Sequence, residues 1–311
     1  MRALLQADTD YLNHARTPVL IDEWHHVPEV WDRVRRLVDS DSTGGRFILA
    51  GSAAPVGAKL HSGAGRIIKF QMRPLAFAER NLPVPTVHVR DLLSAGTTDI
   101  YGSSNVGLRD YVTEILSSGF PHARQLSDRA RGVWLDDYIE RVITHYFAEQ
   151  GHRIRSPELL RGWLWGYASA TATATSLATI GDNLDPGEPT GPTKLTSIAY
   201  RDILNRLYLI DHVDPWSPGR KLPSRASLAP KRFLADPALC ARLLNLNETK
   251  LLSAAEPAIN NRDSTRLGDF FEALVALSLH TYAAANGAQL SHFRDHDGRH
   301  EIDFIIHRGH A

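Results

Sequence analysis

Residues 18–23, with the sequence PVLIDE, place a run of apolar residues directly before two acids. Continuous Val, Leu and Ile are typical of a buried parallel strand, and ligands gather at the carboxyl ends of such strands. An Asp at that place can hold a hydrated magnesium ion, and the next Glu can orient an attacking water. The pattern predicts half of a nucleoside-triphosphate site, with Asp22 as the metal ligand and Glu23 as the catalytic residue.

A second strand is predicted at residues 46–50, RFILA, and it runs into Gly51 and Ser52. Between the strands, residues 28–38 carry apolar side chains at helical spacing, so the segment predicts a right-handed βαβ unit with parallel strands. Parallel strands end at the same edge of a sheet. We therefore expect Ser52 near the two acids, where its hydroxyl would sense a γ-phosphate or position a water.

The other half of such a site is a glycine-rich phosphate loop with a lysine, which should follow an earlier strand. The 17 residues before Pro18 contain no such loop. Residues 51–59, GSAAPVGAK, resemble one, but Ala58 separates Gly57 from Lys59, and Pro55 lacks an amide for phosphate binding. We interpret this segment as an ordinary loop. Independent ATP hydrolysis is not expected, because positioning and charge stabilisation supply nearly all catalysis of phosphoryl transfer.

Composition sets broad limits on partners and compartment. Lys plus Arg equals Asp plus Glu at 35 each, so no global field favours nucleic acid or an acidic membrane. Cys240 is the single cysteine, which excludes an internal disulfide and favours a reducing compartment. Residues 163–181 are uncharged but rich in Ala, Thr and Ser, and would make a poor membrane span. We expect a cytoplasmic protein without membrane contact.

The middle of the chain is predicted to be mostly helical, with a winged-helix-like segment at about 159–235. Its expected elements are helices at 159–174, 176–184 and 195–208, followed by wing strands at 207–210 and 232–234. Residues 194–232 carry eight Lys or Arg against three Asp, which favours contact with DNA phosphates. The candidate DNA-binding residues are Arg201, Arg206, Arg220, Lys221 and Arg225. A solvated face or a contact between domains is the alternative interpretation of this charge.

The C-terminal segment combines a long apolar helix at 268–282 with strands at 289–294 and 300–306, joined through Asp297-Gly298. A helical Glu272 followed by a strand Asp303 resembles the start of a restriction-endonuclease-like core, in which both acids would bind magnesium. The next strand of that core should supply a Glu-x-Lys, and no Glu or Lys follows Asp303. We expect remnants of a metal site here, without nuclease activity. The consecutive His25 and His26 point apart on a regular element and predict no zinc site.

Taken together, several motifs resemble a family of prokaryotic AAA-type ATPases whose C-terminal region is catalogued as domain of unknown function 4143. The matching residues are 18–24, 27–31, 47–53, 63–67, 72–79, 119–121, 136–138, 229–231, 236–237, 271–272 and 301–303. The resemblance implies that Asp22 and Glu23 are a Walker B pair, that Ser52 is the sensor and that Arg66 is a phosphate-contacting arginine. It also implies ATP and Mg²⁺ as cofactors, although neither is expected to bind tightly.

We therefore predict an α/β fold with an incomplete P-loop NTPase parallel sheet of AAA type at 1–85. A helical region with the winged-helix-like segment follows at 86–244, and a partial α+β restriction-endonuclease-like end at 245–311. The leading hypothesis is a truncated or degenerate AAA-type ATPase-like protein that associates with itself or a partner through exposed sheet edges. One alternative is ATP hydrolysis with a phosphate loop from an upstream segment or partner. The other is a DNA-binding module acting through the basic winged helix.

Overall fold

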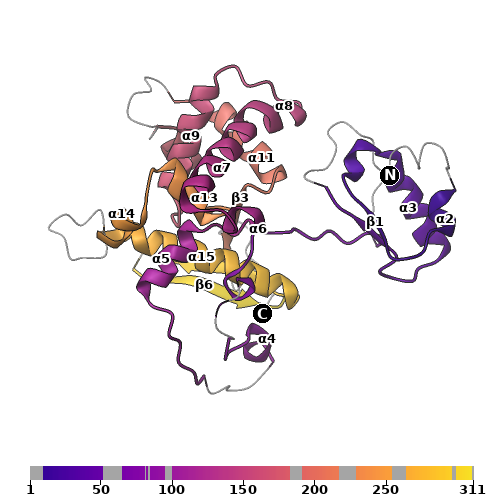
Figure 1. Cartoon of the computed structure of the whole chain (residues 1–311), viewed down its shortest axis with the longest axis horizontal. Coiled ribbons are helices and arrows are strands. Elements are labelled where there is room, and N and C mark those ends of the chain that lie inside the picture. Colours follow the sequence, from indigo (N-terminus) through magenta and orange to yellow (C-terminus); the bar gives the residue numbers. More distant parts are fainter. Residues whose placement is uncertain are drawn as a thin grey trace. The chain divides into compact units, whose positions relative to one another are not determined.

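The computed structural model forms two compact units, which are described separately below (Figure 1). Unit 1 comprises Met1–Met72 with Tyr146–Arg153, and unit 2 comprises Arg73–His145 with Ile154–Ala311. The residues that the structure describes are 10–51, 65–80, 82, 85–94, 100–182, 191–216, 229–253, 264–295 and 299–309. Within these ranges, no helix combines the length and apolar character needed to cross a membrane.

Unit 1 contains a two-stranded parallel sheet joined through a helix. Its elements are α2 (Tyr11–His14), β1 (Val19–Ile21), the 3₁₀ helix η1 (Trp24–His26), α3 (Glu29–Ser40) and β2 (Phe47–Leu49). In the sheet Val19 is opposite Phe47, and Leu20 is opposite Ile48. The predicted parallel pairing of these strands is confirmed. Pro28 precedes α3, and Glu29 in its first turn complements the positive end of the helix dipole.

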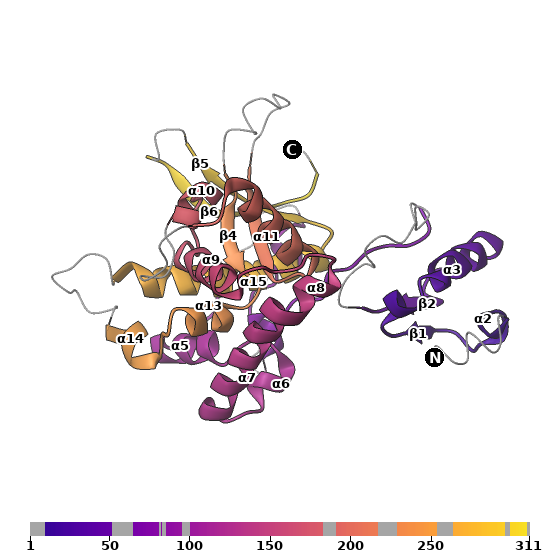
Figure 2. The same ribbon diagram turned by 90° about the horizontal axis from the view of Figure 1, so that it is seen from above.

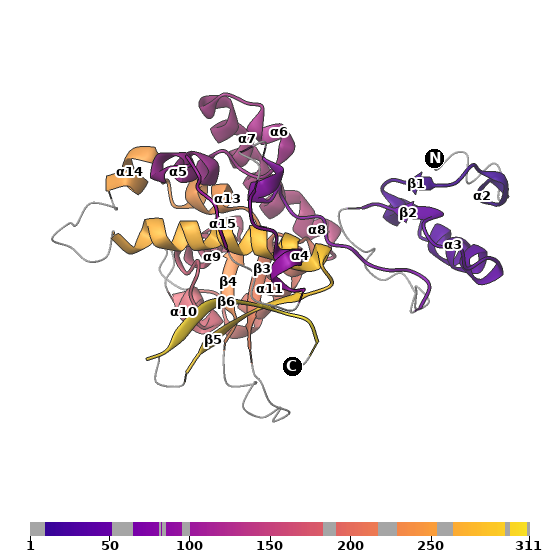
Figure 3. The ribbon, with the colours of Figure 1, turned by 90° about the horizontal axis from the view of Figure 1, so that it is seen from below.

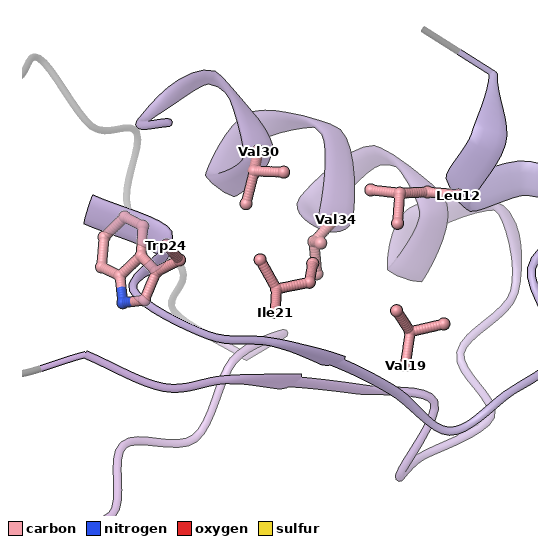
Figure 4. Close-up of a cluster of buried hydrophobic side chains, with 6 residues drawn as sticks. All are labelled: Leu12, Val19, Ile21, Trp24, Val30 and Val34. Carbon is pink, nitrogen blue, oxygen red and sulfur yellow. The ribbon is translucent and has the colours of Figure 1, made fainter. Parts of the chain in front are cut away.

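The core of unit 1 lies between α3 and one face of this sheet (Figure 4). Its buried side chains are Leu12, Val19, Ile21, Trp24, Val30 and Val34. Side chains alternate across a strand, so Leu20 points away from this core and is 55% exposed. Its neighbour Ile48 is 54% exposed. The second face of the sheet is therefore apolar and open to solvent.

Unit 2 packs helices around a four-stranded sheet (Figures 2 and 3). Its helices before the sheet are η2 (Phe77–Glu79), α4 (Val89–Leu92), α5 (Leu108–Leu116), α6 (Pro121–Arg124), α7 (Asp128–Arg141), α9 (Pro157–Ser169), α10 (Leu177–Asp182) and α11 (Lys194–Arg206). After α7 the chain forms the π-helix η3 (Val142–Tyr146), and the following α8 (Phe147–Glu149) belongs to unit 1. The later helices are α13 (Pro237–Leu243), α14 (Glu248–Ser253) and α15 (Ser264–Ala285).

The sheet of unit 2 has the strand order β4-β3-β5-β6. Its strands are β3 (Ile210–Pro215), β4 (Lys231–Leu234), β5 (Gln289–Arg294) and β6 (Glu301–His307). β3 is antiparallel to β4 and parallel to β5, and β6 is antiparallel to β5. Helix α15 contacts β4, β5 and β6, and buried residues from the helix and the sheet form one core cluster. Residues on both sides of the predicted boundary at 244 therefore share one sheet.

The three helices and the two wing strands expected at 159–235 occur in the predicted order, as α9, α10, α11, β3 and β4, but β3 begins at Ile210, where the strand predicted at 207–210 ends. The winged-helix assignment itself stays a prediction. The first helix is shorter than expected and ends at Ser169. The reason is that Ala172 donates a backbone hydrogen bond to Arg232, whose own amide donates to Thr173. This short stretch therefore pairs with β4 instead of continuing the helix.

Candidate functional site

The first candidate site lies where β1 ends in unit 1. The amide of Ala50 donates to the carbonyl of Ile21 at 2.9 Å, so the ends of β1 and β2 lie side by side. Asp22 and Glu23 follow β1 directly, and both are exposed. Glu23 has φ 50° and ψ 42°, in the left-handed region that non-glycine residues rarely adopt. This turn starts η1 and directs the Trp24 side chain into the core.

Histidines surround the Glu23 carboxylate. His25 Nδ1 lies 3.3 Å from Glu23 Oε2, which makes an ion pair when the imidazole is protonated. The rings of His25 and His26 have centroids 4.2 Å apart. The atoms through which Glu23, His25 and His26 could bind a metal ion lie within 4.8 Å of one another. The expectation that the two histidines point apart is wrong, because they lie on a tight 3₁₀ turn, where side chains do not alternate as on a strand.

Of the other predicted residues of this site, the structure describes Arg66 and does not bring it to the acids. Ser52 lies outside the described residues. Arg66 forms an ion pair with Asp39, in the last turn of α3. Helix α3 begins next to the acidic edge, and at about 1.5 Å per residue Asp39 lies about 15 Å further along its axis. The structure therefore does not place Arg66 beside Asp22 and Glu23.

The second candidate site is a cluster of acids around Lys231 in unit 2. Lys231 is the first residue of β4, and its side chain is 4% exposed. Its Nζ donates to Glu272 Oε1 on α15 at 2.9 Å and to Asp303 Oδ1 on β6 at 2.6 Å. It also lies 2.9 Å from Glu301 Oε1. The structure thus brings the two predicted metal ligands to one lysine.

Sequence reasoning missed Lys231 and Glu301 as members of this cluster. Lys231 counts among the basic residues of the wing, but it stands two residues before Phe233, so on a strand the two side chains share one face, which is a signal of burial. Glu301 stands two residues before Asp303 on the same strand, so both acids share one face of the sheet. That spacing is the signal by which Glu301 could have been found.

Burial and charge act together on the titrating groups of this cluster. Burial alone would lower the pKa of Lys231, but its hydrogen bonds to Asp303, Glu301 and Glu272 outweigh burial and raise it. Burial raises the pKa of Glu272 to about 6, despite the opposing effect of Lys231. The pKa of Asp269, one turn earlier on α15, is also raised to about 6, mainly by burial. Because these hydrogen bonds raise its pKa, the Lys231 ammonium is protonated at neutral pH.

As arranged, the cluster does not fit the magnesium ion that the nuclease resemblance implies. Mg²⁺ requires near-octahedral oxygen ligands at about 2.0–2.1 Å. Lys231 already stands within 2.9 Å of an oxygen of both Glu272 and Asp303. An ammonium at this position repels a second cation and uses the oxygens that would bind it. No catalytic step through a metal is therefore assigned to this cluster.

The predicted DNA-binding residues are only partly described. Arg201 on α11 pairs with the neighbouring Asp202 at 2.6 Å, and Arg206 lies in the last turn of that helix. Arg220, Lys221 and Arg225 lie outside the described residues. Lys231 and Arg232, both counted in the basic wing, are buried at 3% and 8% exposure. The exposed positive charge of the wing is therefore smaller than its sequence predicts, and DNA binding stays a prediction.

Comparison with known proteins supports the AAA-type character of the first unit. Residues 2–81 match the family model of an AAA domain. Residues 108–250 match a domain of unknown function, DUF8612, which differs from the domain that the sequence motifs resemble. The N-terminal region is thus similar to AAA domains, as predicted at this coarser level.

The curated relatives are mycobacterial. The chain is 26% identical over 235 residues to Uncharacterized protein Rv2008c of Mycobacterium tuberculosis, and equally to Uncharacterized protein Mb2031c of Mycobacterium bovis. Each alignment covers 74% of this chain and 45% of the relative. The chain thus spans about half the length of the curated relatives it matches. No solved structure matches the chain.

Proposed function

We propose that unit 1 is the Walker B half of an AAA-type nucleotide site, and that ATP hydrolysis requires a phosphate loop supplied by another segment or a partner. The observation that carries this proposal is the position of Asp22 and Glu23. They follow a parallel strand directly and lie beside the end of the neighbouring strand. Nucleotides bind at this edge of open α/β sheets. The AAA-domain match over residues 2–81 supports the same assignment.

The two acids have different tasks in this proposal. Asp22 would hold magnesium through its carboxylate, and the metal would neutralise charge on the β- and γ-phosphates. Glu23 would accept a hydrogen bond from the attacking water and align it. His25, 3.3 Å from Glu23 Oε2, would compete for that carboxylate when protonated.

The open surfaces of unit 1 offer a place for the missing half. Within the described residues, β2 pairs only with β1, so its other edge presents unpaired amides and carbonyls. Leu20 and Ile48 are exposed on the face opposite α3. A strand and helix that carry a phosphate loop would pair with this edge and cover this face. Such an addition would bury apolar surface that is otherwise open to water.

The proposal is tested by measuring phosphate release and calorimetric binding of Mg-ATP. The chain alone should give neither saturable heat nor turnover. Adding a polypeptide with a strand, a GxxxxGK[ST] loop and a helix should produce turnover. Glu23→Gln should then lower the turnover at least about 100-fold while nucleotide binding persists.

Glu29→Gln is a matched control, because Glu29 is an exposed acid on the neighbouring helix. It should leave turnover unchanged. Turnover that survives Glu23→Gln would show that Glu23 does not align the water. Steady phosphate release by the chain alone would contradict the need for a supplied loop.

A further inference from the structure

A lysine occupies the centre of the acidic cluster of unit 2. We propose that Glu272, Glu301 and Asp303 form a cation site whose resident cation is the ammonium of Lys231. A divalent metal ion binds there only when the charge of this lysine is removed. The site belongs to unit 2, and the proposal is independent of the nucleotide site of unit 1.

The contacts of Lys231 use its full donor capacity. An ammonium group has three N–H donors, and Nζ lies at 2.9, 2.9 and 2.6 Å from Glu272, Glu301 and Asp303. The lysine comes from β4 and the acids come from α15 and β6. The side chain is 4% exposed, so protein groups replace its water shell. Such a buried charge persists because it is paired on every side.

A bulge in the sheet shapes this cluster. Ser291 is opposite Ile305, whereas Phe293 is opposite Ile302, so β6 has one residue more than β5 in this interval. His292 therefore faces two residues, Asp303 and Phe304. The extra residue allows Asp303 to bind Lys231 while Phe304, which follows it directly, packs against the core between the sheet and α15.

His292 provides a second observation that points to a ligand. Its side chain is 1% exposed, and neither ring nitrogen makes a well-formed hydrogen bond to a described residue. The backbone of Ala229 lies near the ring, and burial and the charge of Lys231 lower the pKa of His292. Buried polar groups are normally paired, so an imidazole without a well-formed partner near Lys231 and Glu301 is a spare ligand for a metal ion.

The charge balance explains why the lysine decides which cation is bound. Three ionised carboxylates and one ammonium leave a net charge of −2 (−3 + 1), and removing the ammonium leaves −3. Carboxylate oxygens favour hard divalent cations such as Mg²⁺ and Mn²⁺. With Lys231 present, the oxygens are already engaged and the nearby positive charge repels a metal. Without it, oxygens of Glu272, Glu301 and Asp303 face a vacated position.

The test measures Mn²⁺ binding by electron paramagnetic resonance in the full chain. Wild type should bind no Mn²⁺ at this site. Lys231→Met, whose side chain is one atom shorter and lacks the charge, should bind one Mn²⁺ that Glu272→Gln removes. Lys231→Arg keeps a cation in place and should bind none. Lys250→Met is a matched control, because Lys250 is an exposed lysine and its loss should create no site.

Mn²⁺ that binds to other acids of the chain stays bound when Glu272→Gln is introduced. Comparison with this variant therefore distinguishes it from Mn²⁺ bound at the cluster. A folded Lys231→Met chain without Glu272-dependent Mn²⁺ binding would overturn the proposal. Wild-type binding of Mn²⁺ that Glu272→Gln removes would overturn it as well, whether or not Lys231→Met folds. Where Lys231→Met does not fold, Lys231→Gln replaces it in the same comparison, with folding checked by circular dichroism.

Discussion

Asp269→Asn should stabilise unit 2 at neutral pH. Burial raises the pKa of Asp269 from 3.8 to about 6. One pKa unit corresponds to about 1.36 kcal/mol, so a shift of about 2 units corresponds to about 3 kcal/mol. Solvent screening at this half-buried position reduces the effect, and we expect a gain of about 1–2 kcal/mol in the free energy of unfolding.

The sign of the predicted stability change follows from the direction in which the pKa of Asp269 is shifted. The native state holds a proton on Asp269 more readily than the unfolded chain does. Below about pH 4 both states are protonated, so the carboxyl group behaves like the neutral amide. Between about pH 4 and 6 the destabilisation by the ionised group grows as pH rises, and above pH 6 it is complete. Asparagine is neutral throughout, so its advantage should appear only as pH rises through this window.

Urea unfolding at pH 4 and pH 7.5, followed by circular dichroism, measures this difference. Asp137→Asn is the control, because Asp137 is exposed and pairs with Arg141 one turn away at 2.8 Å. Its loss should destabilise the chain by about 0.3–0.5 kcal/mol at pH 7.5. A stability gain of Asp269→Asn that is equal at both pH values would refute the electrostatic reasoning. A loss of stability at pH 7.5 would do so too.

Two further predictions concern buried groups of unit 2. Glu114→Gln should lower the free energy of unfolding by about 3 kcal/mol, because Glu114 pairs with the buried Arg80 at 3.3 Å and with Arg124 at 2.8 Å. Urea melts measure the change, with the exposed Glu158→Gln as control, and equal stability of both variants contradicts it. Burial raises the pKa of Cys240 to about 12, so its thiol should not react with a disulfide reagent until the chain unfolds. Rapid labelling under native conditions would show that the thiol is accessible.

Local sequence patterns predicted the elements of unit 1 because the relevant contacts are short in sequence. The apolar runs around Ile21 and Leu49 are buried by a helix that lies between them in the chain. Their parallel pairing follows from the handedness of a βαβ unit. The side chain of Arg66 was not predictable in this way. Its partner Asp39 lies 27 positions earlier in the sequence, and no periodic pattern links the two residues.

The lysine-centred cluster shows a different limit of sequence reasoning. The sequence predicts Glu272 and Asp303 from their positions, one on a helix and the other on a strand that comes later in the chain. Lys231 reaches them because β4 and β6 belong to one sheet, in the order β4-β3-β5-β6, and α15 contacts both strands. That order depends on contacts between residues far apart in the chain. A count of basic residues along the sequence therefore assigned Lys231 to a solvated wing.

The central position of β3 has a consequence for how this protein is made. One side of β3 pairs with β4, which follows soon after, and the other side pairs with β5 at Ser291 and His292. During synthesis the ribosome completes β4 long before it completes β5. In the interval, the growing chain carries a half-complete sheet with an unsatisfied edge. Nascent chains of this protein should therefore depend on chaperones until β5 has emerged, and a stall before that point should favour aggregation.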